Sequence, residues 1–514
     1  MIELIFVKEE KGYSLLSVIL VFAMISILGL SLLSLTINSM KFVTVNKSTI
    51  QDKASAEMGI EEAMAQIDSA VEKINKDIEN RVLLVDNVLG RLSSSLGSIK
   101  SLGTYKYTIS HETLKSGQNG VFLEKVIIKA PIGDSKRSIT KTITVSTIAE
   151  VFKYGAVSPA DLTLNGAPYI DGDVLVGKDI TTNNRGKFIA YGLFGGGNQW
   201  VPTSFPAIKG NLTVKGNYFN QYSSPYQPTQ QNLNTYFSVV PKIKDRELGI
   251  NPFPISELVV NKGKNFKPNS TFQKGDYIVE KNKKVTVHGN LKINNNLIIH
   301  EGGSLTVYGS LYVGQGATLS GSLILPNPND YIYINQNSTI SKLNLDGEMY
   351  INGTANISND LNTNGTIYVN KETRIENLSN TSGGTLILLC DDEITIANNN
   401  VYNDSPKIID AYFYSNKLLE IYGMGSHMQI NGGIYGNPII LNATKGKTRE
   451  SNFSGSEPYG PWGNKTFYQY PQNQIDPTKS RLAIYYKKEM ILNPPKGIPT
   501  VEKMQVKEID VVYE

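Results

Sequence analysis

A short sequence unit recurs through the second half of this 514-residue chain. Each copy starts with a glycine and then alternates polar with apolar residues, as in GSLTV from Gly303, GSLIL from Gly321 and GTIYV from Gly365. Several successive copies are separated by 18 or 19 residues. Repeats of this length with short strands are typical of β-solenoids, in which each repeat forms one coil. The pattern therefore predicts a right-handed β-helix or a related solenoid over 154–450, with a β-sandwich as the alternative.

The alternation also predicts which side chains point into the solenoid. The two apolar residues of each copy lie two positions apart, so they share one face of a strand. The residues expected inside are Leu305, Val307, Leu323, Leu325, Ile367, Val369, Leu386 and Leu388. Gly and Asn suit the corners because both tolerate left-handed backbone angles, and stacked Asn side chains can form ladders between coils.

An uncharged segment dominates the N-terminal region. No Asp, Glu, Lys or Arg occurs from Gly12 to Met40. As a helix, residues 15–35 would span roughly 31 Å, enough to cross the hydrocarbon core of a bilayer. The segment is longer than the apolar core of a secretory signal, and no small-residue cleavage site follows it. Two lysines precede it and one follows, which favours a cytoplasmic N-terminus and an extracellular head.

The next segment predicts an amphipathic helix. Its apolar residues recur at steps of three and four, namely Ile67, Val71, Ile74, Ile78, Val82 and Val85. We expect one helix to begin in the membrane and continue outside it, with Asn38 and Asn46 as candidate sites for a break. The expected organisation is a leader over 1–12, a transmembrane helix over 13–40, an amphipathic helix over 41–90, a small β region or solenoid cap over 91–153, the solenoid over 154–450, and a C-terminal cap or tail over 451–514.

The N-terminal segment resembles the class III signal of type IV pilins and pseudopilins. In that family a short leader ends in Gly, a prepilin peptidase cuts after it, and the new N-terminal aromatic residue is methylated. Gly12 and Tyr13 match these two positions, and Ser-Leu-Leu follows them. The segment ASAEMGIEEAMAQI, residues 54–67, is similar to the post-membrane segment of PilX-type minor pilins. The resemblance covers roughly the first 70 residues and implies a subunit of a filament.

Two features depart from the family pattern. The leader carries three Glu and two Lys, whereas family leaders are usually basic. Pilins usually carry Glu as the fifth residue after the cut, where it is thought to pair with the amino terminus of a neighbouring subunit, but Ser17 stands there. A carboxylate in hydrocarbon is costly unless it is paired. By resemblance, Ser17 at this subunit contact implies a minor, tip-located or initiating subunit; alternatively, it belongs to a membrane helix that never polymerises.

Groups that could carry catalysis or bind a metal are sparse. Asp391, Asp392 and Glu393 are adjacent, but they alternate across a strand, so at most two share a face, and a solvated turn is the preferred interpretation. The four His residues show no metal-ligand spacing, and no phosphate-binding glycine motif occurs. Cys390 ends an apolar strand and is expected to be buried. We therefore expect no enzyme, metal or cofactor, and a carbohydrate-active enzyme is the remaining catalytic alternative.

Aromatic loops are the best candidates for binding. Residues 192–206, 218–228 and 457–472 mix aromatic residues with Asn and Gln, which suits recognition of a sugar or a protein. The candidate ligand-binding residues are Trp200, Tyr222, Tyr226, Tyr459 and Trp462. The alternative is that these loops pack over the flank of the solenoid or cap its end.

The near balance of charge bears on which classes of partner the protein could bind. The net charge is +4, from 50 basic and 46 acidic residues, which gives no support for nucleic-acid binding. The sequence predicts a minor pilin-like surface protein that inserts in or caps a filament and displays its head for assembly, adhesion or DNA uptake. Its expected partners are membrane lipid, other pilin subunits, a prepilin peptidase and an extracellular polysaccharide or other surface ligand. The alternative is a single-span adhesin or sugar-binding protein that does not polymerise.

Overall fold

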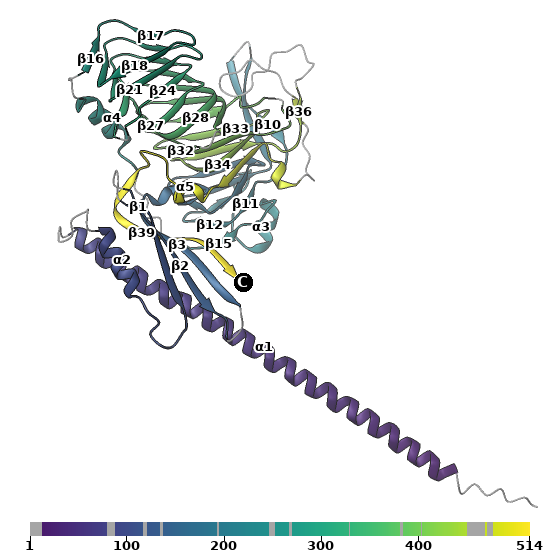
Figure 1. Ribbon diagram of the computed structural model, residues 1–514. Coiled ribbons are helices and arrows are strands. Elements are labelled where there is room, and N and C mark those ends of the chain that lie inside the picture. Colours follow the sequence, from purple (N-terminus) through teal and green to yellow (C-terminus); the bar gives the residue numbers. More distant parts are fainter. Residues whose placement is uncertain are drawn as a thin grey trace, which may run out of the picture. The chain divides into compact units, whose positions relative to one another are not determined.

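The computed structural model contains two compact units, and each is described by itself (Figure 1). The first comprises residues 1–113, 124–145 and 506–514, and the second comprises 114–123 and 146–505. The residues that the structure describes are 13–79, 88–116, 121–133, 137–192, 195–245, 252–266, 270–327, 329–380, 384–401, 403–449, 468–469 and 476–513.

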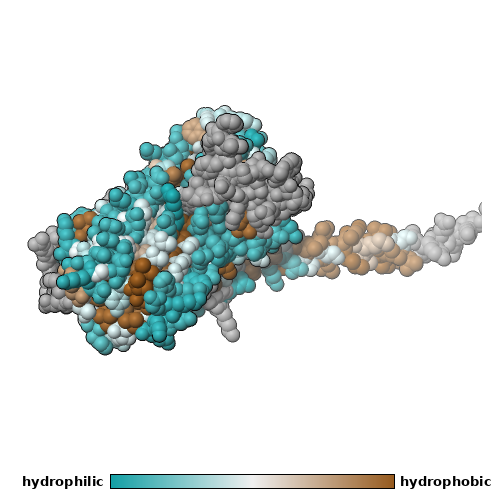
Figure 2. Space-filling view, turned by 90° about the horizontal axis from the view of Figure 1, so that it is seen from above, coloured by the Kyte–Doolittle hydropathy of each residue, from teal (hydrophilic) through white to brown (hydrophobic). Residues whose placement is uncertain are grey.

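One long helix, α1 (Tyr13–Glu79), begins the first unit and continues for 67 residues without a break at Asn38 or Asn46. Its first half is apolar on all sides, and its large side chains from Leu15 to Ile50 are exposed (Figure 2). By length and composition this helix can cross a membrane. The predicted transmembrane and amphipathic segments are therefore parts of one helix.

The second half of α1 has one buried face. The buried side chains recur at steps of three and four, and they are Ala56, Ile60, Ala63, Ile67, Val71 and Ile74. This confirms the predicted amphipathic stripe as far as Ile74; Ile78 is half-buried, and Val82 and Val85 lie outside the described residues. A second helix, α2 (Val88–Ser98), turns Val88, Leu92 and Leu96 inward, which is the same helical spacing.

A four-stranded sheet completes the first unit. Its strands, in spatial order, are β1 (Thr108–Ser116), β2 (Phe122–Pro131), β3 (Ser138–Ile148) and β39 (Thr500–Tyr513). Lys141 on β3 pairs with Glu508 on β39 at 3.0 Å and with Glu61 on α1 at 3.7 Å, so one cation links two strands and the helix. Because β39 is the neighbour of β3, the whole solenoid is inserted in the sequence between two adjacent strands of this sheet.

The second unit is a β-solenoid, as predicted. It has about 13 turns and three faces of parallel strands. The first face contains, in spatial order, β16 (Ser270–Gln273), β19 (Asn290–Ile293), β22 (Leu311–Val313), β25 (Tyr331–Ile334), β27 (Asn344–Ile351), β28 (Ala355–Val369), β30 (Leu386–Cys390), β32 (Lys407–Ser415), β34 (Met428–Tyr435), β4 (Ala156–Ser158), β7 (Val174–Val176), β12 (Asn211–Val214) and β15 (Lys242–Ile243).

The other two faces follow the same order of coils. The second contains β17 (Tyr277–Val279), β20 (Leu297–Ile299), β23 (Ala317–Leu319), β26 (Ser338–Ser341), β28, β29 (Thr373–Asn380), β31 (Ile394–Ala397), β33 (Leu419–Gly423), β35 (Ile439–Ala443), β5 (Leu162–Gly166), β8 (Ile180–Asn183) and β13 (Tyr218–Phe219). The third contains β18 (Lys284–His288), β21 (Ser304–Tyr308), β24 (Ser322–Ile324), β27, β28, β29, β32, β34, β38 (Leu482–Tyr486), β6 (Tyr169–Asp171) and β11 (Ala207–Lys209).

The spatial order of the coils differs from their order in the chain. Strand β4, the first of the solenoid in sequence, pairs with β34 on one side and β7 on the other, so the chain enters at an interior coil. It builds outward as far as β15, then continues at the opposite end with β16 and winds back to β38, which pairs with β6. Residues 482–486, which the sequence analysis assigned to a C-terminal tail, are thus part of the solenoid, and β39 is part of the sheet.

The solenoid interior follows the predicted alternation. All eight residues expected inside are at most 4% exposed, and they belong to one apolar cluster with Cys390. The predicted Asn ladder is also confirmed at one corner, where Asn370 Nδ2 donates to Asn352 Oδ1 at 2.9 Å and Asn352 Nδ2 donates to Asn335 Oδ1 at 3.4 Å. Side-chain amides therefore continue the stacking of the backbone along the coils.

The outer side of the first face carries stacked tyrosines. Tyr350 and Tyr368 have ring centroids 4.8 Å apart, and those of Tyr414 and Tyr435 are 4.0 Å apart. The helix α4 (Ile255–Lys264) and the 3₁₀ turn η3 (Glu150–Lys153) cover this row, forming a second apolar cluster with it. The remaining elements are β9 (Arg185–Gly192), β10 (Gly195–Pro202), β14 (Pro225–Tyr226), α3 (Gln230–Tyr236), β36 (Thr448–Arg449), β37 (Tyr468–Gln469), η4 (Pro477–Lys479) and α5 (Glu489–Leu492).

Candidate functional site

The residues predicted for processing and subunit contact lie at the start of α1. Gly12 lies outside the described residues, and Tyr13 is the first residue of α1. Ser17 follows one helical turn later and is exposed. The structure therefore places Ser17 on the uncovered apolar part of the helix, where a neighbouring helix or lipid could contact it.

Five hydroxyl groups along α1 donate hydrogen bonds within the helix. Ser26, Ser31 and Thr36 each donate to the backbone carbonyl four residues earlier, at 2.8 Å. Thr44 and Thr49 do the same. An unsatisfied hydroxyl would be costly in hydrocarbon, so these internal bonds make the segment compatible with lipid or with a packed helix bundle.

The predicted aromatic residues are distributed over different environments. Trp200 on β10 is 38% exposed, and Tyr222, in the turn after β13, is 78% exposed. Tyr226 on β14 is half-buried, with its ring 4.4 Å from that of Tyr236 and 5.7 Å from that of Tyr218. Burial raises the pKa of Tyr226 to about 12. Tyr226 is therefore part of the packing over the last coils, and Tyr459 and Trp462 lie outside the described residues.

Trp200 lines a polar pocket of about 340 Å³ on the second face of the solenoid. The pocket is bounded by the outward side chains of β5, β8 and β35, by the hairpin β9–β10, and by the turn after β13. Its lining residues are Thr163, Asn165, Thr181, Asn183, Lys187, Trp200, Asn220, Gln221, Ser223 and Ile440. Of the predicted binding residues, Trp200 lines it directly, and Tyr222 lies between two lining residues in the turn.

The hairpin is held on the solenoid by packing next to the pocket. Trp200 and Lys187 are directly opposite each other in the antiparallel pair, so both side chains lie on the same face of the hairpin. The next residue, Phe188, is buried and packs with Tyr422 and Met424 of the solenoid. The alternation of the strand thus buries one side chain as an anchor and leaves its neighbour in the pocket.

A hydrogen-bonded row of polar side chains extends from Asn165 in the pocket wall to residues outside the lining. Asn165 Nδ2 donates to Asn442 Oδ1 at 2.9 Å, and Asn442 Nδ2 donates to Glu420 Oε1 at 3.0 Å. The same carboxylate oxygen lies 3.5 Å from Lys187 Nζ. Among the described lining residues, Lys187 is the one charged side chain, and Glu420 compensates it.

The turn after β13 is ordered by its own side chains. Asn220 Oδ1 accepts hydrogen bonds from the backbone N–H groups of Tyr222 and Ser224, at 2.9 and 3.1 Å. Asn220 Nδ2 donates to the Tyr236 hydroxyl at 3.3 Å, which ties the turn to α3. The polar groups on this side of the pocket are therefore held in place without a ligand.

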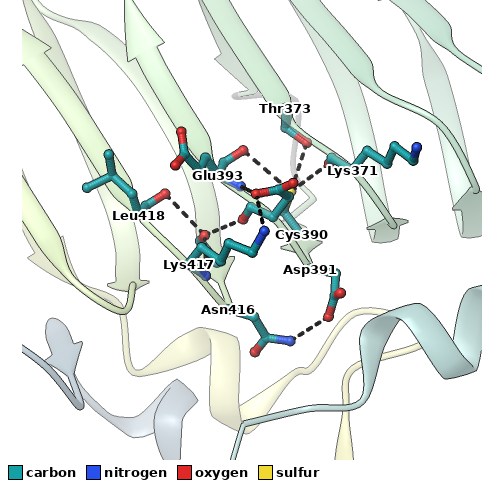
Figure 3. A network of polar contacts seen from close by, with 10 residues as sticks. Lys371, Thr373, Cys390, Asp391, Glu393, Asn416, Lys417 and Leu418 are labelled. Atoms are coloured by element: carbon teal, nitrogen blue, oxygen red, sulfur yellow. Dashed lines mark hydrogen bonds and ion pairs between the residues drawn. The ribbon is translucent and has the colours of Figure 1, made fainter.

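The three adjacent acids lie in the turn between β30 and β31, outside the pocket lining, and Figure 3 shows Asp391 and Glu393 there. Asp391 accepts a hydrogen bond from Asn416 at 2.8 Å, and Asp392 forms an ion pair with Lys417 at 2.9 Å. Burial raises the pKa of the adjacent Cys390 thiol to about 12. No group of three His, Cys, Asp or Glu side chains that could hold a metal occurs among the residues that the structure describes.

Comparison with known proteins gives distant structural likenesses, among them two solved structures. No protein-family model and no curated protein matches this chain. A crystal structure of an ice binding protein from an Antarctic Biological Consortium is 11% identical, with 48% of this chain and 86% of that chain covered, at a TM-score of 0.21. The competence-associated pilin ComZ from Thermus thermophilus is 10% identical, with coverage of 80% and 84% and a TM-score of 0.24.

Proposed function

We propose that this chain is a minor pilin-like subunit that is anchored in a membrane by α1, enters or caps a filament through the same helix, and displays the solenoid outside the cell. Prepilin peptidase would cut after Gly12, and Tyr13 would become the methylated N-terminus. The solenoid would then act as the adhesive or sensing part of the subunit, and lipid and other pilin subunits would be partners of α1.

The observation that carries this proposal is the construction of the first unit. The first half of α1 exposes apolar side chains on every side, and such a helix requires lipid or other helices around it. The second half packs against a small sheet, so the same helix joins an apolar tail to a folded unit. The solenoid is inserted in the sequence between β3 and β39, so the chain passes from the helix into the sheet of the first unit before it enters the solenoid.

The position of Ser17 supports a minor rather than a major subunit. A major pilin needs the carboxylate at this position to meet the amino terminus of its neighbour, and a hydroxyl cannot form that ion pair. A subunit at the end of a filament has one neighbour fewer, so it can lack the carboxylate at less cost. We therefore infer a tip-located or initiating position.

The mature N-terminus tests this proposal directly. Mass spectrometry of the chain from the membrane fraction of cells that express a prepilin peptidase should find Tyr13 at the N-terminus, with a methyl group on its nitrogen. Gly12→Val should abolish the cut because the peptidase recognises this Gly. Gly29→Ala is the matched control in the same helix, since an added methyl group meets nothing within 4 Å, and it should be processed normally.

The second candidate is a permanent single-span anchor for the same head. The all-round apolar surface of α1 favours it as much as it favours a filament subunit, because lipid alone can cover that surface. An intact Met1 in the membrane fraction of peptidase-positive cells would contradict the filament proposal. The protein would then be a surface protein that does not polymerise.

A further inference from the structure

We propose that the pocket beneath the hairpin β9–β10 binds an uncharged oligosaccharide, with the Trp200 ring as its stacking platform. The inference deepens the proposed function and rests on it in one respect, namely that the head is displayed outside the cell. Four properties of the pocket lead to it: an available aromatic ring, uncharged polar walls, a compensated charge and an ordered frame.

The first property is the exposure of Trp200. Phe188 on the partner strand is 6% exposed and Tyr218 on β13 is also 6% exposed, whereas Trp200 is 38% exposed. A large apolar ring that remains in contact with water beside polar groups is available to a ligand. The C–H faces of a pyranose ring are apolar and flat, so they match an indole ring better than a charged or purely polar ligand does.

The second property is the chemistry of the walls. Thr163 and Thr181 present outward hydroxyl groups from neighbouring strands, paired in register on β5 and β8. Asn183 and Gln221 add amides, which both donate and accept hydrogen bonds. Sugar hydroxyls also donate and accept, so a wall of hydroxyls and amides can satisfy them whichever way they turn. This is the pattern of a concave site with a few fixed polar groups.

The third property is the absence of uncompensated charge among the described lining residues. The Lys187 ammonium is 3.5 Å from Glu420, and that carboxylate is also held by Asn442. An acidic sugar or a phosphate would have to compete with Glu420 for this cation while approaching a carboxylate of its own sign. The ion pair therefore selects against anionic ligands, including nucleic acid, and favours neutral sugars.

The fourth property is the order of the frame. The turn that carries Gln221 is fixed through Asn220, and the Gln221 side chain itself accepts from the Asn184 N–H at 3.5 Å. Asn183 Oδ1 accepts from the Arg185 N–H at 3.0 Å, which orients its amide at the start of the hairpin. These two amides therefore lose little side-chain entropy when a ligand binds, which lowers the cost of binding in a pocket of this size.

The test uses the full chain with Trp462→Phe, because the sequence contains two Trp residues and this change leaves Trp200 as the single indole reporter. The protein is kept in phospholipid nanodiscs, since detergents with sugar headgroups would compete for the site. An array of neutral, sialylated and uronate-containing glycans identifies the binders. The best neutral glycan is then titrated while Trp200 fluorescence is followed.

We expect binding to at least one neutral glycan and a saturable change in Trp200 emission. In the array format, Trp200→Ala should weaken binding at least tenfold. Phe272→Ala is the control, because this aromatic residue on β16 is 50% exposed and lies outside the pocket lining, and it should bind like the parent. Loss of binding in both variants, or in neither, would overturn the assignment of Trp200 as the platform.

A second variant tests the role of the ion pair as a selectivity element. Glu420→Gln leaves the Lys187 cation in the pocket without its carboxylate, so the variant should gain binding to uronate-containing glycans that the parent rejects. Lys187→Met in the same background should remove that gain. A purely structural role for Glu420 would lower the thermal midpoint and leave the glycan preference unchanged.

Three outcomes would overturn the proposal as a whole. The first is no binding to any neutral glycan, and the second is binding to acidic glycans alone. The third is that the protein binds duplex DNA or an unrelated protein instead of glycan, and that this binding requires Trp200. These measurements use purified protein whose N-terminus is known. If no glycan binds, the pocket proposal fails, but the processing experiment still tests the proposed filament role independently.

Discussion

At the scale of single residues, Gly166 lets two strands that are far apart in the sequence, β5 and β35, approach each other closely. Its φ angle is +81°, and an added Cβ would overlap the carbonyl oxygen of Ala443 on the neighbouring strand β35. Both the left-handed backbone and the lack of space exclude a side chain. This glycine sits at the end of β5, next to the polar wall of the pocket.

We predict that Gly166→Ala lowers the free energy of unfolding by about 2 kcal/mol or more, because strained backbone and overlap with main-chain atoms add to each other. Urea unfolding followed by circular dichroism measures the change. Gly275→Ala is the matched control, since the corresponding Cβ meets nothing within 4 Å and its backbone is not left-handed. Equal stability of the two variants would show that the β5–β35 contact is looser than described.

Ser17 provides a second prediction at this scale. Ser17→Glu restores the carboxylate that the major pilins carry, so copies of the variant should pair with neighbours on both sides. Immunogold labelling of sheared filaments should then move from the filament ends to positions along the shaft. Ser17→Ala adds no carboxylate and should stay at the ends, and shaft labelling of this control would contradict the proposed role of the missing charge.

At the scale of elements, the stacked tyrosines on the first face hold α4 against the solenoid. Tyr368 donates to the Gly497 carbonyl at 2.7 Å, and Tyr331 donates to the Lys262 carbonyl at 3.1 Å at the end of α4. Burial raises the pKa of Tyr368 and Tyr350 well above the ordinary range, because a phenolate in this layer would lose its hydration. The layer is therefore stable only with neutral rings.

The burial of tyrosine rings in the solenoid unit predicts that the protein loses stability at high pH. A tyrosine ionises near pH 10 in the unfolded chain, whereas the pKa values of Tyr218, Tyr226 and Tyr333 are raised to about 12 in the fold. Their contribution is therefore fully present below pH 10 and is lost as the pH rises toward 12. The urea midpoint should stay level from pH 8 to 9.5 and fall between pH 10 and 12. A midpoint that stays level throughout that upper range would contradict the burial of these rings.

At the scale of the whole molecule, the solenoid contains neighbouring coils that come from opposite ends of its sequence. Strands β4, β5 and β6 lie between β34, β35 and β38 on one side and β7, β8 and β11 on the other. The interior coil of residues 156–171 therefore cannot complete its pairing until the last coil has formed. Contacts of such long sequence separation slow folding because the loop must close first.

A cross-link tests this order. Asn165 and Asn442 are partners in register, and their side chains are hydrogen-bonded at 2.9 Å. In a chain with Cys390→Ser, the pair Asn165→Cys and Asn442→Cys should form a disulfide under mild oxidation, because directly opposed strand positions suit disulfide geometry. The pair Asn165→Cys and Asn335→Cys joins distant coils and should stay reduced. Failure of the first pair to cross-link in the folded protein would contradict the placement of β5 beside β35.

The features of this fold that could be predicted from the sequence are those that depend on residues close together in the chain. Alternation with a period of two depends only on neighbouring residues, so the inward residues such as Leu305 and Ile367 could be identified correctly. The same holds for the stripe from Ile67 to Ile74 on α1 and for the Asn ladder at the corners. The composition of residues 192–206 was also enough to predict Trp200 as a surface aromatic residue. It could not predict the pocket around Trp200, which distant strands form.

Only the tertiary structure decided which coils are neighbours and which side chains meet. Every coil offers similar edge hydrogen bonds, so nothing local to β4 indicates that it pairs with β34 as well as with β7. The pocket combines residues from 163 to 440, and Lys187 meets Glu420 only because the hairpin folds over those stacked strands. Sequence periodicity specifies which way a side chain points within its own strand. Which strand lies next to it depends on how distant segments of the chain pair, and that pairing determines which residues line the pocket.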